Sequence, residues 1–243
     1  MSNGAALIVG AGDATGGAIA RAFAREGLTA CVTRRARNLD QLAALVSAIE
    51  AEGGKARAFG VDAREEDATI ALIDQIEAQV GPLEVCVFNI GANVRFGINE
   101  TTARVYQKVW EMAAYSGFLA GREAARVMIP RGRGTILFTG ATASLRGRDG
   151  FSAFAGGKHA LRALAQSMAR ELGPRGIHVA HIVIDGAIDS RFIRDNIPDT
   201  DSLRARDGLL LPDEIARNYV WLHRQHRSAW THELDLRPWS ETW

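Results

Sequence analysis

The chain has 243 residues, of which 47% are hydrophobic, and its formal net charge at pH 7 is +1. This hydrophobic fraction supplies a sizeable core, and the scattered arginines give no indication of binding to nucleic acid or to an anionic membrane. No stretch approaches about 18 uninterrupted apolar residues, and the first residues, MSNGAALIVG, have no basic region. We therefore expect a soluble, cytoplasmic protein without a membrane partner.

Apolar strand-like runs alternate with helical patterns along the whole chain, with no linker rich in proline or serine. The expected strands are 5–10, 28–33, 55–62, 83–91, 134–140, 176–185 and 228–238. The expected helices are 14–27, 38–54 with Asn38 as its cap, 65–81, 102–128, 151–173 and one from about Pro212, and 185–210 is expected to be a polar loop. Long helices between strands predict parallel βαβ units, so we expect one α/β domain over 1–243 with a doubly wound parallel sheet.

The cysteines and the C-terminal histidines indicate no metal site. Cys31 and Cys86 each lie in an apolar run, and we interpret them as reduced core thiols. His223 and His226 lie about one helical turn apart, but no third ligand accompanies them. A solvated helix face is the better interpretation of this pair.

A glycine-rich turn, IVGAGDATGGAIA, follows the first strand and opens the first helix. Gly10, Gly12 and Gly16 allow a tight turn and let a pyrophosphate approach the backbone at the helix N-terminus. The same glycines could instead serve close packing of strand and helix. The position between strand and helix favours a dinucleotide site at the carboxyl ends of the strands.

The end of the second strand, CVTRRARN, carries no acid to hold an adenosine ribose 2′-hydroxyl. Arg34 and Arg35 follow instead, and two guanidinium groups suit a 2′-phosphate, which they can bind bidentately. The alternative is that one or both are solvated surface arginines. The sequence thus favours NADP over NAD.

Several motifs in the expected order resemble those of the short-chain dehydrogenase/reductase family, over nearly the entire chain. Gly10 and Gly16 match the outer glycines of its G-x-x-x-G-x-G element, with Ala14 in the middle place. FNIGA resembles its N-N-A-G element, keeping Asn89 and Gly91 but placing Phe88 first. FAGGK matches its Y-x-x-x-K element at the lysine.

The resemblance implies a Rossmann fold and roles for particular residues. VDARE resembles the family's Asp-Val element, so Asp62 would bond the adenine amino group and Ala63 would lie beside the ring. IVIDGAIDS stands at the family's P-G segment, with Asp185 in place of proline. The residues implied to border the nicotinamide and its carboxamide are Gly186, Ile188 and Ser190.

The family's catalytic lysine is kept as Lys158, whereas the other three catalytic side chains are absent at the matching places. Phe154 replaces the tyrosine that exchanges a proton with substrate, Ala141 replaces the serine, and Ala114 replaces the asparagine. A one-residue shift would instead bring in Thr142 or Tyr115. Lys158 would still hold the nicotinamide ribose, unless it merely extends to solvent.

Two groups of polar residues are candidates to replace the missing catalytic side chains, either by facing the substrate or by donating the proton. Ordinary loop and helix chemistry explains these residues equally well. They are Thr142, Ser144 and Arg146 in one loop, and Tyr115, Ser152 and His159 elsewhere. The first hypothesis is an NADP(H)-dependent oxidoreductase with an unorthodox proton donor, acting on a small carbonyl or alcohol of unknown identity, with 185–210 as its lid. The alternative is a non-catalytic dinucleotide-binding sensor or partner subunit.

Small residues on the helices at 102–128 and 152–172 permit close helix packing, and the resembled family commonly pairs these helices between subunits. Four tryptophans gather near the C-terminus, namely Trp221, Trp230, Trp239 and Trp243. They either close the domain's own core or contribute to contacts between subunits. We expect a homodimer or homotetramer.

Overall fold

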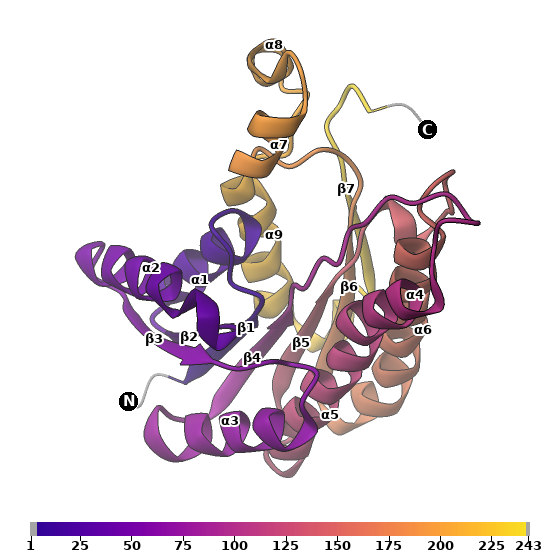
Figure 1. The fold of residues 1–243 in the computed structure, drawn as a ribbon. Coiled ribbons are helices and arrows are strands. Elements are labelled where there is room, and N and C mark those ends of the chain that lie inside the picture. The colour runs from indigo at the N-terminus through magenta and orange to yellow at the C-terminus, as the bar shows by residue number, and fades with distance from the viewer. Residues whose placement is uncertain (1–3, 242–243) are drawn as a thin grey trace.

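The computed structural model describes residues 4–241, which form a seven-stranded parallel sheet of order β3-β2-β1-β4-β5-β6-β7 (Figure 1). Its strands are β1 Ala5–Val9, β2 Thr29–Arg34, β3 Lys55–Gly60, β4 Leu83–Phe88, β5 Gly134–Thr139, β6 Ile177–Ile184 and β7 Glu233–Leu236. The order reverses next to β1, where the chain passes from β1–β3 to β4. Such a reversal opens a crevice at the carboxyl ends of the strands, where ligands bind in this architecture. The predicted doubly wound α/β fold is confirmed.

Helices cover both faces of the sheet (Figure 1). They are α1 Thr15–Arg25, α2 Leu39–Ala51, α3 Glu66–Gln79, α4 Ala103–Trp110, α5 Ser116–Met128, α6 Ser152–Leu172, α7 Arg191–Asn196, α8 Thr200–Ala205 and α9 Pro212–Arg224, with short 3₁₀ turns η1 Ala36–Asn38, η3 Ile129–Arg131, η4 Thr142–Ser144, η5 Gly173–Arg175 and η6 Arg227–Ala229. Alternate residues of β1 enter opposite cores: Ile8 packs with α1, α2 and α9, and Leu7 packs with α3, α5 and α6. Burial on both faces explains why the central strands β1 and β4 are nearly continuously apolar, whereas the edge strands β3 and β7 carry charged residues.

Two segments differ from the sequence prediction. The helix expected at 102–128 is interrupted by a π-helical stretch, η2 Glu111–Tyr115, between α4 and α5. The segment 185–210 is not simply a loop, because it contains the short helices α7 and α8. Its two ends are joined where the Asp189 amide donates to the Leu210 carbonyl at 2.9 Å and the Leu210 amide donates to the Ala187 carbonyl at 2.9 Å.

Two local predictions are wrong. Asn38 lies at the N-cap of α2, but its side chain makes no capping hydrogen bond. His223 does not lie on a solvated helix face: Nδ1 pairs with the Thr135 hydroxyl at 2.9 Å, and the ring packs edge-on against Phe23. His226 lies beyond the end of α9 and pairs with Ser228. Contacts to residues distant in the chain therefore decided the environment of His223.

The buried thiols of Cys31 and Cys86 are both fully inside the core, as predicted. Burial raises the pKa of each thiol to about 12, so both remain protonated at neutral pH. Within residues 4–241, no helix is long and apolar enough to cross a membrane. Trp243 lies outside the described residues.

Candidate active site

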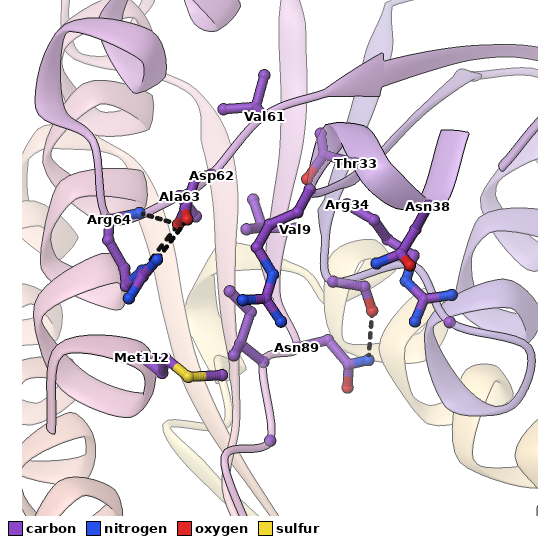
Figure 2. Close-up of a pocket in the computed structure, with 15 residues that line it drawn as sticks. Val9, Thr33, Arg34, Asn38, Val61, Asp62, Ala63, Arg64, Asn89 and Met112 are labelled. Atoms are coloured by element: carbon purple, nitrogen blue, oxygen red, sulfur yellow. Dashed lines mark hydrogen bonds and ion pairs between the residues drawn. The ribbon is translucent and has the colours of Figure 1, made fainter. Parts of the chain in front are cut away.

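The glycine-rich turn has the geometry that a close ligand approach requires. Gly10 has a φ of +92°, and a Cβ at Gly16 would lie 2.5 Å from the Gly10 carbonyl oxygen. A Cβ at Gly12, by contrast, would meet nothing within 4 Å. Asn89 fixes the turn to β4, since its Nδ2 donates to the Gly10 carbonyl at 3.1 Å (Figure 2). Gly10 and Gly16 are thus needed for the turn itself, whereas Gly12 borders open space.

The smaller of two cavities at this edge of the sheet has a volume of about 210 Å³ and is lined by polar groups (Figure 2). The structure brings together here the residues assigned to the adenosine half of a cofactor, namely Arg34, Arg35, Asp62 and Ala63, with Gly10 and Gly12 of the glycine turn and Asn89 and Gly91 of FNIGA. They come from the ends of four neighbouring strands. Their convergence follows from the parallel register of these strands.

Arg64 is a member of this cavity that the sequence analysis missed. Its Nε and Nη2 donate to the two carboxylate oxygens of Asp62 at 2.9 and 2.6 Å, and its amide donates at 3.2 Å (Figure 2). The Arg64 side-chain bonds hold the pKa of Asp62 below its usual value. Asp62 is therefore an ionised carboxylate with a fixed orientation. Asp62 and Arg64 lie two residues apart in VDARE, and this spacing was the sequence signal that could have revealed the pair.

The two arginines after β2 are half-buried, so neither is a freely solvated side chain. Arg34 donates to the side-chain oxygen of Gln41 on α2. Arg35 lies close enough to Asp62 for its charge to help lower the pKa of that carboxyl. Both guanidinium groups thus border the cavity from different sides.

The larger cavity, of about 570 Å³, adjoins the glycine turn on the side of β5 and β6. The sequence-assigned residues that line it are Ala141, Phe154, Lys158, Gly186, Ile188 and Ser190, together with Gly10, Gly12, Gly16, Asn89 and Gly91. Ala114 does not line it; this residue is buried in the π-helical stretch. The structure therefore brings Phe154, Ala141 and Lys158 together but leaves Ala114 apart.

Lys158 is held at the carboxyl ends of β4 and β5 by backbone oxygens. Its Nζ donates to the Ile90 carbonyl at 3.0 Å and to the Thr139 carbonyl at 2.8 Å, and the residue is only 2% exposed. Burial lowers the pKa of this amine to about 7. The alternative of a lysine that extends to solvent is excluded.

Glycines on α6 explain how the lysine reaches this place. A Cβ at Gly156 would lie 2.6 Å from the Tyr106 hydroxyl, and one at Gly157 would lie 2.9 Å from the Cβ of Ala113. These two positions let α6 approach α4 and the π-helical stretch closely. The opposite side of the same turn then carries Lys158 inward toward the sheet.

Phe154 packs in a small apolar cluster rather than beside a polar group. The cluster contains Phe154, Ala143 and Ala155, with Ala141 and Phe151 against it. The Phe154 ring centroid lies 6.0 Å from the Lys158 amine. Because phenylalanine and alanine occur together here, no hydroxyl is left without a partner.

Only some of the candidate replacement groups face this cavity. Thr142 and Arg146 line it, whereas Ser144, Tyr115, Ser152 and His159 do not. Ser144 is fully buried and accepts from the Ala141 amide, Tyr115 stacks between Trp110 and Phe118, and His159 pairs with the Ala155 carbonyl. Ser152 Oγ is buried without a hydrogen-bond partner among the described residues. Four of the six candidates thus do not line the larger cavity.

Asp185 is a buried carboxylate that contacts Thr142 and Arg146, two polar residues of the cavity lining. It is 1% exposed, accepts from the Thr142 hydroxyl, and lies 3.6 Å from the Arg146 guanidinium and 3.5 Å from that of Arg237. Two arginines and a hydroxyl thus compensate one buried carboxylate. The sequence analysis noted Asp185 only as a departure from proline.

Comparisons with known proteins agree with this geometry. The sequence profile of the short chain dehydrogenase family matches residues 4–200. The chain belongs to the short-chain dehydrogenase/reductase family. A short-chain dehydrogenase from Rhodopseudomonas palustris is 48% identical, with a TM-score of 0.83 over 98% of this chain and 99% of that chain.

Two further family members have more specific names. A gluconate 5-dehydrogenase of Gluconobacter oxydans is 31% identical over 179 residues, which are 74% of this chain and 69% of that relative. A 7 alpha-hydroxysteroid dehydrogenase solved with NADH and 7-oxo glycochenodeoxycholic acid is 25% identical, with a TM-score of 0.86 over 97% of this chain and 94% of that chain. Members of this family are thus named for dehydrogenase activity on chemically different alcohols.

Proposed function

We propose that the protein is an NADP(H)-binding oxidoreductase that interconverts a small carbonyl compound and its alcohol. The observation that supports the proposal is the cradle formed by the glycine turn, in which Gly12 borders open space between the two cavities. NADP would supply or accept a hydride when bound. The relative solved with NADH shows that this fold holds a nicotinamide dinucleotide, but the choice between NADP and NAD rests on Arg34 and Arg35.

Each part of the cofactor has matching groups in the chain. Asp62 and Ala63 would hold the adenine, Arg34 and Arg35 the 2′-phosphate, and the turn at Gly12 the pyrophosphate. Lys158 in its protonated form would donate its third N–H to the nicotinamide ribose, because the carbonyls of Ile90 and Thr139 take the other two. The residues proposed to border the nicotinamide are Gly186, Ile188 and Ser190. All of them line one of the two cavities.

The proton chemistry of this site is unorthodox in the proposal, because Phe154 and Ala141 offer no acidic hydroxyl. Thr142, bonded to Asp185, is placed to orient a substrate oxygen from the side of Ala141. The apolar cluster around Phe154 also favours a second candidate function, a dinucleotide-binding protein without catalysis. Turnover of any carbonyl compound with NADPH separates the two.

We further propose that 185–210 is a lid over the substrate. Phe192 and Ile193 of α7 line the larger cavity. Buried Asp189 ties the segment together through Arg194 at 3.6 Å and Arg204 at 3.2 Å. An ordered, charged segment of this kind can exclude water from the cavity.

Titration with NADP⁺ and NAD⁺ tests the cofactor proposal. We expect Arg34→Ala and Arg35→Ala each to weaken NADP⁺ binding about tenfold or more, because a charge-assisted bond contributes about 1.5–3 kcal/mol, and to leave NAD⁺ binding unchanged. Arg37→Ala is the matched control, since Arg37 is exposed and does not line the cavity. Equal affinity of the parent for the two nucleotides would refute the preference.

We also propose that the protein is a homodimer or homotetramer formed through α4 and α5. Trp110 and Phe118 are 42% and 39% exposed, and Tyr115 stacks between their rings on this surface. Exposed stacked aromatic side chains are typical of protein interfaces. Light scattering at micromolar concentration is expected to give a multiple of the 26.3 kDa chain mass. The double variant Trp110→Lys, Phe118→Lys is expected to have the mass of a monomer. A parent protein with the mass of a monomer would contradict the proposed homodimer or homotetramer.

A further inference from the structure

Within residues 4–241, the nitrogen of the Lys158 amine has one position without a hydrogen-bond partner. Its bonds to the carbonyl oxygens of Ile90 and Thr139 take two N–H groups, because a carbonyl can only accept. In the neutral amine both N–H groups are then donated, and the remaining tetrahedral position is the lone pair. Lys158 lines the larger cavity, so the exposed part of this residue belongs to that cavity.

The surroundings of the amine favour its neutral form. The ring facing it is that of Phe154, 6.0 Å away, and a phenylalanine has no hydroxyl to occupy the lone pair. Burial lowers the pKa of Lys158 to about 7, and no acidic side chain of residues 4–241 offsets this effect. His181 is the titratable neighbour beneath Gly140, and burial lowers its pKa to about 4, so it is neutral at pH 7. A desolvated lysine of this kind is a nucleophile rather than a cation.

We propose that Lys158 is a nucleophilic amine that forms an imine with small aldehydes and ketones entering the larger cavity. The nitrogen lone pair attacks the carbonyl carbon, the C=O π bond breaks as the N–C bond forms, and one N–H proton of the adduct moves to the carbonyl oxygen. The resulting carbinolamine then loses its hydroxyl together with the second N–H proton as water. A C=N bond remains, and the N–H bonds donated to the Ile90 and Thr139 carbonyls are given up. No oxidant or reductant is consumed, so the reaction is independent of the proposed hydride transfer.

The cavity walls indicate the class of carbonyl compound. Phe151, Phe154 and Ile188 supply apolar and aromatic surface near the amine, and the volume of about 570 Å³ accommodates a single aromatic ring with short substituents. Water is poorly supported beside these side chains, which favours the loss of water from the carbinolamine. Aromatic and short branched aldehydes fit this site best.

Reductive trapping tests the proposal directly. The purified protein, freed of bound nucleotide, is incubated at pH 7 with benzaldehyde and sodium cyanoborohydride, whose hydride converts an imine to a stable secondary amine. Peptide mapping then measures labelling of each of the three lysines. Lys55 and Lys108 are exposed and serve as internal references.

We expect Lys158 to be labelled at least about tenfold faster than Lys55 or Lys108, since roughly half of its amine is neutral at pH 7. Labelling of Lys158 at or below the rate of the references overturns the proposal, and this comparison needs no variant. Lys158→Met is expected to abolish labelling of this peptide only.

Phe154→Tyr provides a variant of nearly unchanged shape. Its phenolic hydroxyl can bond the free position of the amine, so we expect labelling of Lys158 to slow at least fivefold while the references are unaffected. An unchanged rate at Lys158 would show that the position facing Phe154 is not the reactive one, and would overturn the assignment. Circular dichroism of both variants checks that they are folded.

Discussion

The two cavities at the carboxyl edge of the sheet share the glycine turn but differ in their chemistry. The smaller cavity is bordered by fixed charges, with Asp62 held by Arg64 and with Arg34 and Arg35 on other sides. In the larger cavity, the place around Phe154 is an apolar cluster that contains Ala143 and packs against Ala141. The groups suited to holding a dinucleotide are present, whereas the hydroxyls that would exchange a proton are absent.

If the proposed function is correct, this difference means that cofactor binding and proton transfer depend on separate residues of one fold. The cradle depends on backbone geometry and on charges at strand ends, which are independent of the residue four positions before Lys158. Because Phe154 and Ala141 carry no polar side-chain atom, neither position adds a buried polar group without a partner. Lys158 lines the larger cavity and donates to the backbone carbonyls of Ile90, just after β4, and of Thr139, at the end of β5.

Restoring the missing hydroxyls is the change with the largest expected effect. Phe154→Tyr combined with Ala141→Ser should raise NADPH-dependent reduction of simple ketones about 10²- to 10⁴-fold, because general acid help is typically worth that much. The steady-state rate at which NADPH absorbance falls measures this reduction. The parent should reduce the same ketones slowly or undetectably.

The single variants and the parent are the controls for this experiment. Phe154→Tyr and Ala141→Ser alone should each fall well below the pair, and NADP⁺ affinity should stay within about twofold throughout. A parent that already turns over simple ketones briskly would show that another group, such as Thr142, serves as the acid.

Two glycines of the turn can separate residues needed for the fold from residues needed for cofactor binding. A side chain at Gly16 would meet backbone atoms at 2.5 and 2.8 Å, so Gly16→Val should lower the free energy of unfolding by about 1–3 kcal/mol. Gly12→Val meets nothing within 4 Å and should leave the free energy of unfolding within about 0.5 kcal/mol. It should nevertheless weaken NADP⁺ binding about tenfold or more, by occupying the space for the pyrophosphate.

Urea unfolding and nucleotide titration of the two variants test this pair. If Gly12→Val bound NADP⁺ as well as the parent, the cradle assignment would be wrong. Equal destabilisation by both substitutions would show instead that the turn needs each glycine for its own geometry.

The smallest expected effect is a pH dependence of stability due to Lys158. Its pKa is lowered from 10.5 to about 7 in the folded protein by burial, so between pH 7 and 9 the unfolded chain binds more protons than the folded one. The free energy of unfolding should therefore rise with pH in this window, by about 2 kcal/mol from this residue. Because other titrating groups cancel in the difference, parent and Lys158→Met are compared by urea unfolding at both pH values. If the free energy of unfolding changed equally with pH in the parent and in Lys158→Met, folding would not lower the pKa of Lys158.

The sequence predicted the order and type of nearly all elements because apolar periodicity is a local property of the chain. The turn at Gly10, the basic residues after β2 and the FAGGK stretch also identified the edge of the sheet that forms the site. Contacts between distant segments were not readable in this way: the hydrogen bond from Thr142 to Asp185 joins residues 43 positions apart and depends on the register of the folded sheet. The bond from Arg64 to Asp62 joins residues only two positions apart and was overlooked. The π-helical stretch and α7 escaped prediction because short, irregular turns have no distinctive period.

The C-terminal tail meets both ends of the segment 185–210. Pro238 lies where a Cβ at Gly186 would be 2.7 Å from its ring, and the Trp239 indole donates to the Arg206 carbonyl at 3.0 Å. Trp239 is nevertheless 79% exposed. The Trp239 indole is therefore a largely exposed fluorophore bonded to the proposed lid: if this segment opens, loss of the bond to Arg206 should change the emission and anisotropy of Trp239.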